Sequence, residues 1–385
     1  MLFREENRYL DIARKILDEG YYDPPSESRT GIGATKLHVE HMEFTLLDGK
    51  VPILSTRKVP YKNPIIELCW FASGSTDIKF LKDRNCPVWD QWVLRGTEIY
   101  DQEIDVGLRE LEKRGLIKFG EDMQAKARRA DFMLKYGDGL VAQLLGDLTG
   151  VEPPARKLLG GSIGPGAYGA QWRKWEDTRA IPYNDEAELN KLTALGYRDL
   201  TDEILPGAVL SDNPALRIMR KEYDQLQEVI DRIKNKPCDR RIIVSAWNPG
   251  RLDQAALAPC HSFFQFLPFE KNGVKYLDLS LTCRSQDFLL GTVFNVMQYG
   301  VLCHLVAKLT GRVAHKLYWT GNNTHIYDNQ KEIFDEYHRE RSPLKNNIKL
   351  EIADSVQSIA DFLPENIQVT GYDNFMEPIK YPIAV

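Results

Sequence analysis

The chain has 385 residues, of which 43% are hydrophobic and 27% are charged, and its formal net charge is −5 at pH 7. This balance is ordinary for a globular protein and argues against a nucleic-acid-binding surface, so we expect no DNA binding. The sequence has no apolar run of the ~18 residues that a membrane span needs, no signal peptide, no Cys-x-x-Cys pair and no histidine cluster, so we expect a cytoplasmic protein without a metal.

The first quarter of the chain predicts a helix, a strand and a second helix. Apolar residues recur at helical spacing from Glu5 to Glu19, and Gly20 supplies a stop. From Val39 to Leu47 apolar and polar residues partly alternate, and a turn follows at Asp48-Gly49. This pattern is typical of a strand that leads into a hairpin. The next helix is expected from Ile65 to Phe71.

Two polar stretches follow, at approximately residues 93–160 and 184–212. The first is charged and has the spacing of helices. Neither carries a motif of reactive side chains, and long connections of this kind are usually surface insertions. We therefore expect one catalytic domain over residues 1–385 with two insertions.

The second half predicts an amphipathic helix, several buried strands and a central helix. Pro214 is suited to the first helical position, and an apolar stripe continues to Lys234. The stripe consists of Leu216, Met219, Tyr223, Leu226, Val229, Ile230 and Ile233. Buried strands are expected at 241–247, 263–267 and 276–283. The run Phe288–Leu309 is too apolar for a surface helix, so we expect it to cross the centre of an α/β (α+β) protein.

Cys260 is the most informative single residue, because it lies between Pro259 and His261 at the entrance to an apolar strand. A rigid Pro-Cys turn at a strand edge can direct a thiol into a cavity. The thiolate is the reactive form, so nearby cations must lower its pKa, and Arg240, Arg241 and Arg284 are candidates. The alternative is a small buried hydrophobic residue without chemistry.

Motifs along most of the chain, in the same order, resemble the thymidylate synthase family. They are Ser28–Gly33, Glu67–Gly74, Val88–Trp92, Gly164–Arg173, Cys238–Pro249 with the Cys260 segment, Arg284–Gly291, Phe294-Asn295, Trp319–Tyr327, Gly371–Asp373 and Pro378–Val385. The resemblance implies a mixed β-sheet with a long central buried helix and peripheral helices. It also implies transfer of a one-carbon unit to C5 of a pyrimidine nucleotide.

The resemblance assigns the catalytic roles to four residues. Cys260 adds to C6 of the pyrimidine, Glu67 relays protons, and Tyr168 orders water near C5. Asn295 reads the base, and its amide suits the N3–H and O4 edge of uracil, so dUMP is the expected substrate. His261 could transfer a proton or give a supporting hydrogen bond, and the second role is favoured because adjacent strand residues face opposite ways.

Further residues match the family's binding sites. The phosphate is matched by Arg29, Arg240, Arg241, Arg284 and Ser285, and the ribose by His325 and Tyr327. The pair Arg240-Arg241 reaches into the partner's site in the family, which implies a homodimer with shared active sites. The co-substrate, the reduced folate 5,10-methylene-tetrahydrofolate, is matched by Trp89, Asp287 and the closing tail that ends at Val385.

Three departures from the family pattern leave the product open. Gln298 replaces a serine, Asn322-Asn323 replaces a glycine-rich turn, and the loop Gly164–Tyr168 has one extra residue. Hydride from the folate would give dTMP, whereas water would give 5-hydroxymethyl-dUMP, the product of a related hydroxymethylase branch. Trp89 and the Val385 tail favour dTMP because they help to exclude water.

Two other classes of protein compete with these readings. An inactive relative that binds a nucleotide or RNA is opposed by the intact Cys260, Glu67, Asn295 and Tyr168 and by the acidic charge balance. A papain-like hydrolase is opposed by the lack of a Cys-Gly-x-Cys-Trp signature.

Overall fold

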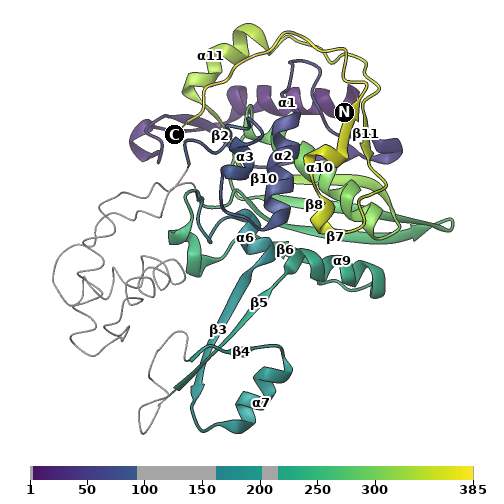
Figure 1. Cartoon of the computed structure of the whole chain (residues 1–385). Coiled ribbons are helices and arrows are strands. Elements are labelled where there is room, and N and C mark those ends of the chain that lie inside the picture. The colour runs from purple at the N-terminus through teal and green to yellow at the C-terminus, as the bar shows by residue number, and fades with distance from the viewer. Residues whose placement is uncertain (1–2, 93–161, 202–215, 385) are drawn as a thin grey trace.

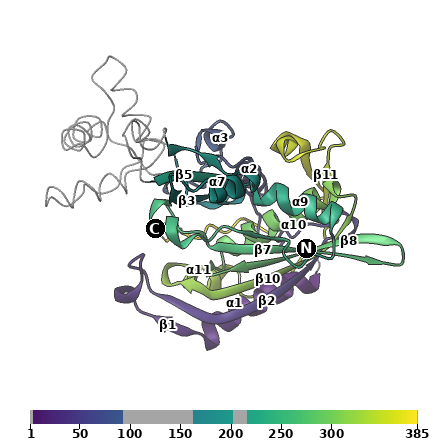
Figure 2. The same ribbon diagram turned by 90° about the horizontal axis from the view of Figure 1, so that it is seen from below.

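A mixed seven-stranded sheet carries the candidate site (Figure 1). The computed structural model describes residues 3–92, 162–201 and 216–384. The strand order is β1-β2-β10-β8-β7-β6, with β9 paired to β10, and Figure 2 shows β7, β8, β10 and β2 following one another. The strands are β1 (Tyr21–Asp23), β2 (Ala34–Thr45), β6 (Ile243–Ser245), β7 (His261–Lys271), β8 (Val274–Cys283), β9 (Gln286–Asp287) and β10 (Val313–Tyr327).

The sheet combines both pairing modes. Strand β10 runs parallel to β8 and β9 but antiparallel to β2, while β7 runs antiparallel to β6 and β8. The strands expected at 241–247, 263–267 and 276–283 are all present. The α/β class with a mixed sheet is therefore confirmed.

Helices pack on the sheet and on one another in one continuous core. They are α1 (Phe3–Glu19), α2 (Lys62–Ser73), α3 (Lys79–Lys82), α6 (Tyr168–Arg173), α9 (Gln225–Asn235), α10 (Gly291–Leu309) and α11 (Asp328–Tyr337). Helix α10 is buried along most of its length, which confirms the central helix expected from its apolar composition. A two-stranded sheet, β11 (Lys349–Ile352) with β12 (Ile367–Thr370), precedes the C-terminal tail.

The two faces of the sheet differ in burial. On β8, Leu277, Leu279, Leu281 and Cys283 are fully buried, as their alternation predicts. The other face carries apolar side chains that remain substantially exposed: Val39, Ile243, Phe263 and Leu267 are 39–47% exposed. Such a surface is available for contact with another chain.

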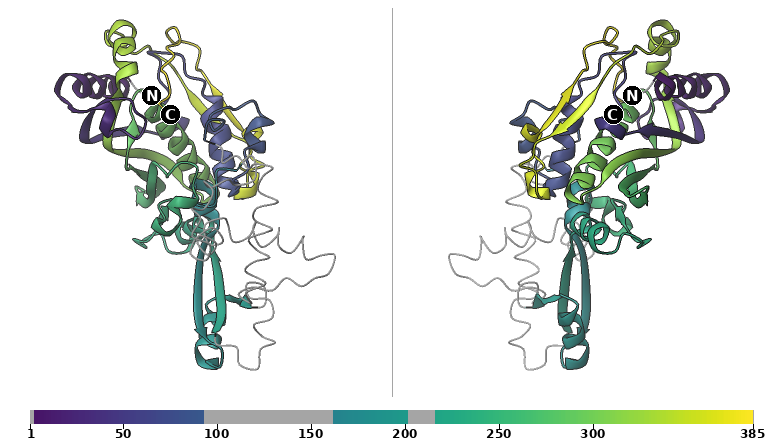
Figure 3. Two further views of the ribbon diagram at one scale, coloured as in Figure 1. Left: turned by 90° about the vertical axis from the view of Figure 1, so that its left-hand side faces the viewer. Right: turned by 90° about the vertical axis from the view of Figure 1, so that its right-hand side faces the viewer.

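An arm projects from the main body (Figures 1 and 3). It consists of the antiparallel strands β3 (Trp175–Pro182), β5 (Leu216–Tyr223) and β4 (Arg198–Asp199), together with α7 (Glu186–Ala194). The arm has a small core of its own, formed by Ile181, Leu192, Tyr197 and Met219. It includes the described part of the stretch expected at 184–212, whereas the stretch at 93–160 lies outside the described residues.

Two expectations from the sequence are wrong. The first is the helix expected over Pro214–Lys234. Leu216–Tyr223 form strand β5 instead, and helix α9 begins only after Asp224, whose side chain caps it by accepting from Gln227 N. Pairing with β3 along the whole of β5 overrides the helical spacing of its apolar residues. Leu216, expected in the core, is exposed.

The second error concerns β2. A tight turn follows it at Leu47–Gly49, with Asp48 at φ 58°. However, β2 pairs with β1 and β10 and not with the segment after the turn, so no hairpin forms there.

Candidate active site

Cys260 lies in the loop that enters β7 and is half-buried. Its backbone N–H donates to the Tyr168 hydroxyl at 2.7 Å. Arg284 holds the same loop, since its Nε donates to Pro259 O at 2.9 Å and its Nη2 to Ala258 O at 2.8 Å. A β-bulge just after Cys260, where the pairing with β8 shifts between His261 and Phe263, adds a local bend.

The charge environment of Cys260 has opposing parts. Burial raises the pKa of the Cys260 thiol, while Arg284, the Tyr168 hydroxyl and Arg29 lower it. Arg284 and Arg29 are thus two cations that favour the thiolate. Burial outweighs them, so the pKa of the thiol stays above its ordinary value.

Tyr168 and His261 are buried side chains next to Cys260. Tyr168 begins α6 and is 3% exposed, with its ring stacked on Phe71. The His261 ring lies against Tyr168 and Tyr299. Burial lowers the pKa of His261 to about 4, so this side chain is neutral near pH 7. A neutral imidazole in this position suits the supporting role better than that of a charged acid.

Glu67 is held by two donors from different parts of the chain. Its Oε1 accepts from Trp89 Nε1 at 2.5 Å, and its Oε2 accepts from Gln298 Nε2 at 2.5 Å. Burial raises the pKa of Glu67 to about 7, although both hydrogen bonds lower it. A carboxyl group that titrates near neutral pH is well suited to relay protons.

Asn295 lies on α10 and is 8% exposed. Its Nδ2 donates to Gln286 Oε1 at 3.1 Å, which fixes the orientation of the amide. Gln286 is itself 2% exposed and belongs to the short strand β9. Sequence reasoning missed Gln286, although it lies inside the motif that supplied Arg284, Ser285 and Asp287.

The expected phosphate residues fall into two groups. Arg29 is exposed and lies over the Trp92 ring, with its guanidinium carbon 5.7 Å from the ring centroid, while Arg284 lies 5.0 Å from that of Trp247. The half-buried Ser285 follows Arg284 directly. Arg29 and Arg284 both lower the pKa of Cys260, so these two cations lie within electrostatic reach of the thiol.

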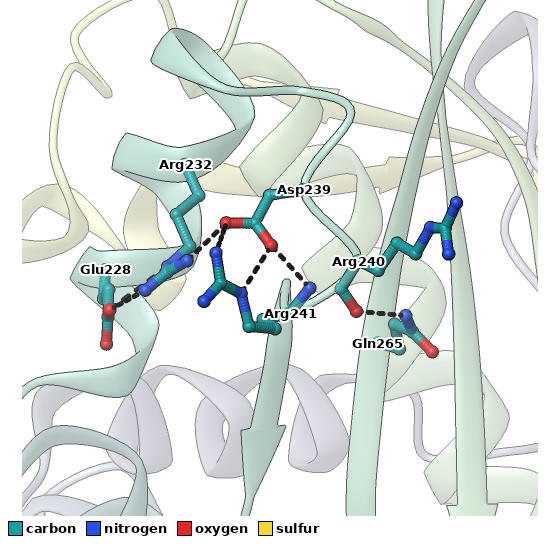
Figure 4. Close-up of polar contacts among 6 residues, drawn as sticks. All are labelled: Glu228, Arg232, Asp239, Arg240, Arg241 and Gln265. Atoms are coloured by element: carbon teal, nitrogen blue, oxygen red, sulfur yellow. Dashed lines mark hydrogen bonds and ion pairs between the residues drawn. The ribbon is translucent and has the colours of Figure 1, made fainter.

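Arg240 and Arg241 form the second group, at the edge of the sheet before β6 (Figure 4). Arg241 contacts Asp239 through its backbone N–H and its guanidinium, and Arg232 of α9 contacts the same carboxylate. These contacts hold the pKa of Asp239 well below its usual range. The Arg240 side chain points away from this cluster and is exposed.

The two residues expected to bind the ribose lie two positions apart on β10. The His325 and Tyr327 rings meet edge to face at 4.8 Å, and His325 Nδ1 donates to Asn323 O at 2.8 Å. Asn323 has a φ of 43°, a conformation that favours glycine or asparagine. Burial raises the pKa of Tyr327, and Asp287, Arg29 and Cys260 also affect it, so these groups share one electrostatic environment.

Asp287 is linked to the C-terminal tail through Gln330. Gln330 Nε2 donates to Asp287 Oδ2 at 3.0 Å and to Pro382 O at 3.1 Å, and Gln330 is fully buried. Tyr381 and Ala384 of the tail are also buried. Hydrogen bonds from Gln330 of α11 therefore connect the Asp287 carboxylate to the tail. Val385 lies outside the described residues, and Gln330 was not expected from the sequence.

The three departures from the family pattern all have defined contacts. Gln298 binds Glu67, and Asn322 Nδ2 donates to Cys283 O at 3.0 Å. In the loop before Tyr168, Gly164 has a φ of 84°, which requires glycine in practice. A Cβ on Gly166 would lie 2.0 Å from Arg251 O, so this loop passes close to the segment that precedes Cys260.

The described ranges contain no group of three or more His, Cys, Asp or Glu side chains arranged to hold a metal ion. Among the helices in those ranges, none is both long and apolar enough to cross a membrane.

Comparisons with known proteins give a consistent result. A family model described as "Thymidylate synthase" matches residues 7–385. A protein named "Thymidylate synthase" from Leuconostoc mesenteroides is 32% identical over 384 residues, and the match covers 99% of each chain. The matched region includes all the site residues described above.

Proposed function

The chain belongs to the thymidylate synthase family, and on that premise we propose that it transfers a one-carbon unit from 5,10-methylene-tetrahydrofolate to C5 of dUMP, forming dTMP and dihydrofolate. The observation that carries the proposal is the setting of Cys260. Its thiol shares one environment with Arg284, Arg29, Tyr168 and Asp287. A nucleophile, two cations that can bind an anion and a half-buried carboxylate thus lie within electrostatic reach of one another.

In the proposed reaction the Cys260 thiolate forms a bond to C6 of dUMP, and the C5–C6 electron pair moves onto the C4 carbonyl. C5 then attacks the methylene carbon, and the C5 proton leaves through water held near Glu67 and Tyr168. The bond between the methylene carbon and the folate nitrogen then breaks, which releases tetrahydrofolate and leaves an exocyclic methylene on C5. Hydride from that tetrahydrofolate adds to the methylene while the Cys260–C6 bond breaks, which gives dTMP, dihydrofolate and the free thiolate. The covalent route divides one difficult reaction into several easier steps.

Asn295 selects the base. An amide offers both a donor and an acceptor, which matches the N3–H and O4 edge of uracil. Gln286 already accepts one Nδ2 proton of Asn295, so the amide is held in one orientation before substrate arrives. A fixed amide supports preference for dUMP over dCMP.

The folate is proposed to lie between Trp89, Asp287 and the tail. Asp287 is half-buried, and the loss of water around its carboxylate is the largest cause of its raised pKa. Such a group gains from a polar N–H donor that enters its site. The tail segment ending at Ala384 packs beside it and would exclude water, which favours hydride transfer over hydration.

We also propose a homodimer with shared active sites. The apolar side chains Ile243, Phe263 and Leu267 are exposed on the sheet face next to Arg240 and Arg241. Burial of that face against a second copy would remove apolar surface from water. It would also bring exposed arginines close to the partner's nucleotide. A cytoplasmic location is proposed as well, in keeping with six free cysteines.

Product analysis tests the function directly. The protein is incubated with dUMP and 5,10-methylene-tetrahydrofolate, and the nucleotide is identified by mass spectrometry. We expect dTMP together with a rise in dihydrofolate absorbance. A product heavier by one oxygen than dTMP, with tetrahydrofolate returned, would assign the hydroxymethylase reaction instead. Binding of dUMP without turnover would identify an inactive nucleotide-binding relative.

A further inference from the structure

Gln298 is a buried side chain that contacts a catalytic group. It lies on α10 one helical turn after Asn295, and it is 1% exposed. Its Nε2 donates to Glu67 Oε2 at 2.5 Å. The contact joins α10 to α2, so it fixes the Glu67 carboxylate relative to the residue that reads the base.

Trp89 holds the other oxygen of the same carboxylate. Its Nε1 donates to Glu67 Oε1 at 2.5 Å, and an indole N–H can only donate. With each oxygen accepting one hydrogen bond, the arrangement suits the ionised carboxylate. We infer that Gln298 is a positioning residue that, together with Trp89, clamps the Glu67 carboxylate and stabilises its ionised form.

The neighbouring titratable groups supply no positive charge that would stabilise the ionised carboxylate. Tyr168 of α6, Tyr299 of α10 and Cys86, which follows α3, each respond to the charge of Glu67. The pKa of each is raised, to about 11 for Cys86 and well above the ordinary value for the two tyrosines, mainly by burial. All three are therefore neutral near pH 7. The hydrogen bonds from Gln298 and Trp89 are the two factors that lower the pKa of Glu67 against burial.

The consequence for the reaction rests on the proposed function, in which Glu67 relays protons. A relay works best when its pKa lies near the working pH. Without Gln298, the Glu67 carboxyl would stay protonated to higher pH and would accept a proton less readily. The contact therefore sets the lower pH limit of activity.

The resting protein provides the first test, because it requires no turnover. The 15N-labelled indole N–H of Trp89 reports the charge of Glu67 through their shared hydrogen bond, and its resonance is assigned by its loss in Trp89→Phe. In wild type the resonance should titrate near pH 7. In Gln298→Met the midpoint should rise by about one pH unit, since one hydrogen bond to a charged group changes ionisation roughly tenfold.

Two further variants separate this role from simple packing. Gln298→Glu keeps the shape but loses the fixed donor and adds negative charge, so its midpoint should rise further. Met297→Leu is the matched control: it is buried in the same helix, carries no polar group and should leave the midpoint unchanged. If Gln298→Met does not fold, Gln298→Leu, which likewise has no hydrogen-bond donor, takes its place with the same expected direction.

Activity provides the second test. The acidic limb of kcat against pH should move in the same direction and by the same amount as the Trp89 midpoint. An unchanged midpoint in the folded Gln298 variants would overturn the inference, as would a lower kcat with an unmoved limb. Failure of wild type to turn over dUMP would overturn the proposed function alone, because the Trp89 titration would still show whether Gln298 acts on Glu67.

Discussion

Tyr168→Phe is the sharpest single test of how the nucleophile is held. The substitution removes one hydroxyl and keeps the ring, which stacks on Phe71 with centroids 4.7 Å apart. That hydroxyl accepts the Cys260 backbone N–H at 2.7 Å and also lowers the pKa of the Cys260 thiol. Removal therefore frees a backbone donor next to the nucleophile and makes the thiolate harder to form.

The expected magnitude follows from the burial of the pair. Loss of the partner of one buried hydrogen bond costs ~1–3 kcal/mol, which corresponds to about 5- to 150-fold in rate. The pKa of Cys260 is already raised by burial and should rise further in the variant. The rate of thiolate attack should consequently reach its plateau at a higher pH than in wild type.

The assay measures the rate at which the protein forms a covalent adduct with 5-fluoro-dUMP and methylene-tetrahydrofolate. This rate is recorded by stopped-flow at several pH values. Tyr276→Phe is the control, because Tyr276 stacks on Phe269 near the opposite end of β8 from Cys283. Adduct formation in Tyr168→Phe at the wild-type rate and with the wild-type pH profile would refute the reasoning.

Three further predictions address the nucleophile, the base and the assembly. Cys260→Ser should abolish turnover while nearly retaining dUMP affinity by calorimetry, and an adduct mapped to Cys238 or Cys283 in wild type would contradict the assignment. Asn295→Asp should shift relative kcat/KM toward dCMP by about 5- to 150-fold, the effect of one mispaired buried hydrogen bond, whereas equal use of both nucleotides by wild type would contradict the base-reading role. The variants Arg240→Ala and Cys260→Ser should each be inactive alone. After they are mixed and exchange subunits, up to about one quarter of the active sites should work, because half of the randomly mixed dimers carry one intact shared site. Activity in a protein that light scattering shows to be a monomer would rule out sharing.

The sequence predicted most reliably those elements whose pattern depends on nearby residues alone. The alternation Leu277, Leu279, Leu281 indicates a strand without knowledge of its partners, and each of these residues is buried. The segment before Asp224 shows the opposite case. Its apolar residues fit a helix equally well, and only pairing with β3, a strand far away in sequence, makes it a strand. Local pattern carries no information about that partner.

The same distinction applies to the candidate site. Motifs indicated Cys260, Glu67 and Asn295, but the amides that hold such groups come from positions that meet only in the folded chain. Gln330 connects α11 to Asp287 and to Pro382, a contact that depends on where the tail docks. Gln298 did have a signal, since it replaces a smaller residue of the family pattern, but its partner Glu67 could not be read from the sequence.

The arm has a consequence for how the protein unfolds. Its buried residues Ile181, Leu192, Tyr197 and Met219 form a core separate from the main one, and strands β3 and β5 lead into it. A unit with few buried contacts opens at a lower free energy than the large core beside it. The arm should therefore exchange its amide hydrogens and become sensitive to proteases while the sheet around Cys260 is still intact. Unfolding of this protein would then proceed in more than one cooperative step.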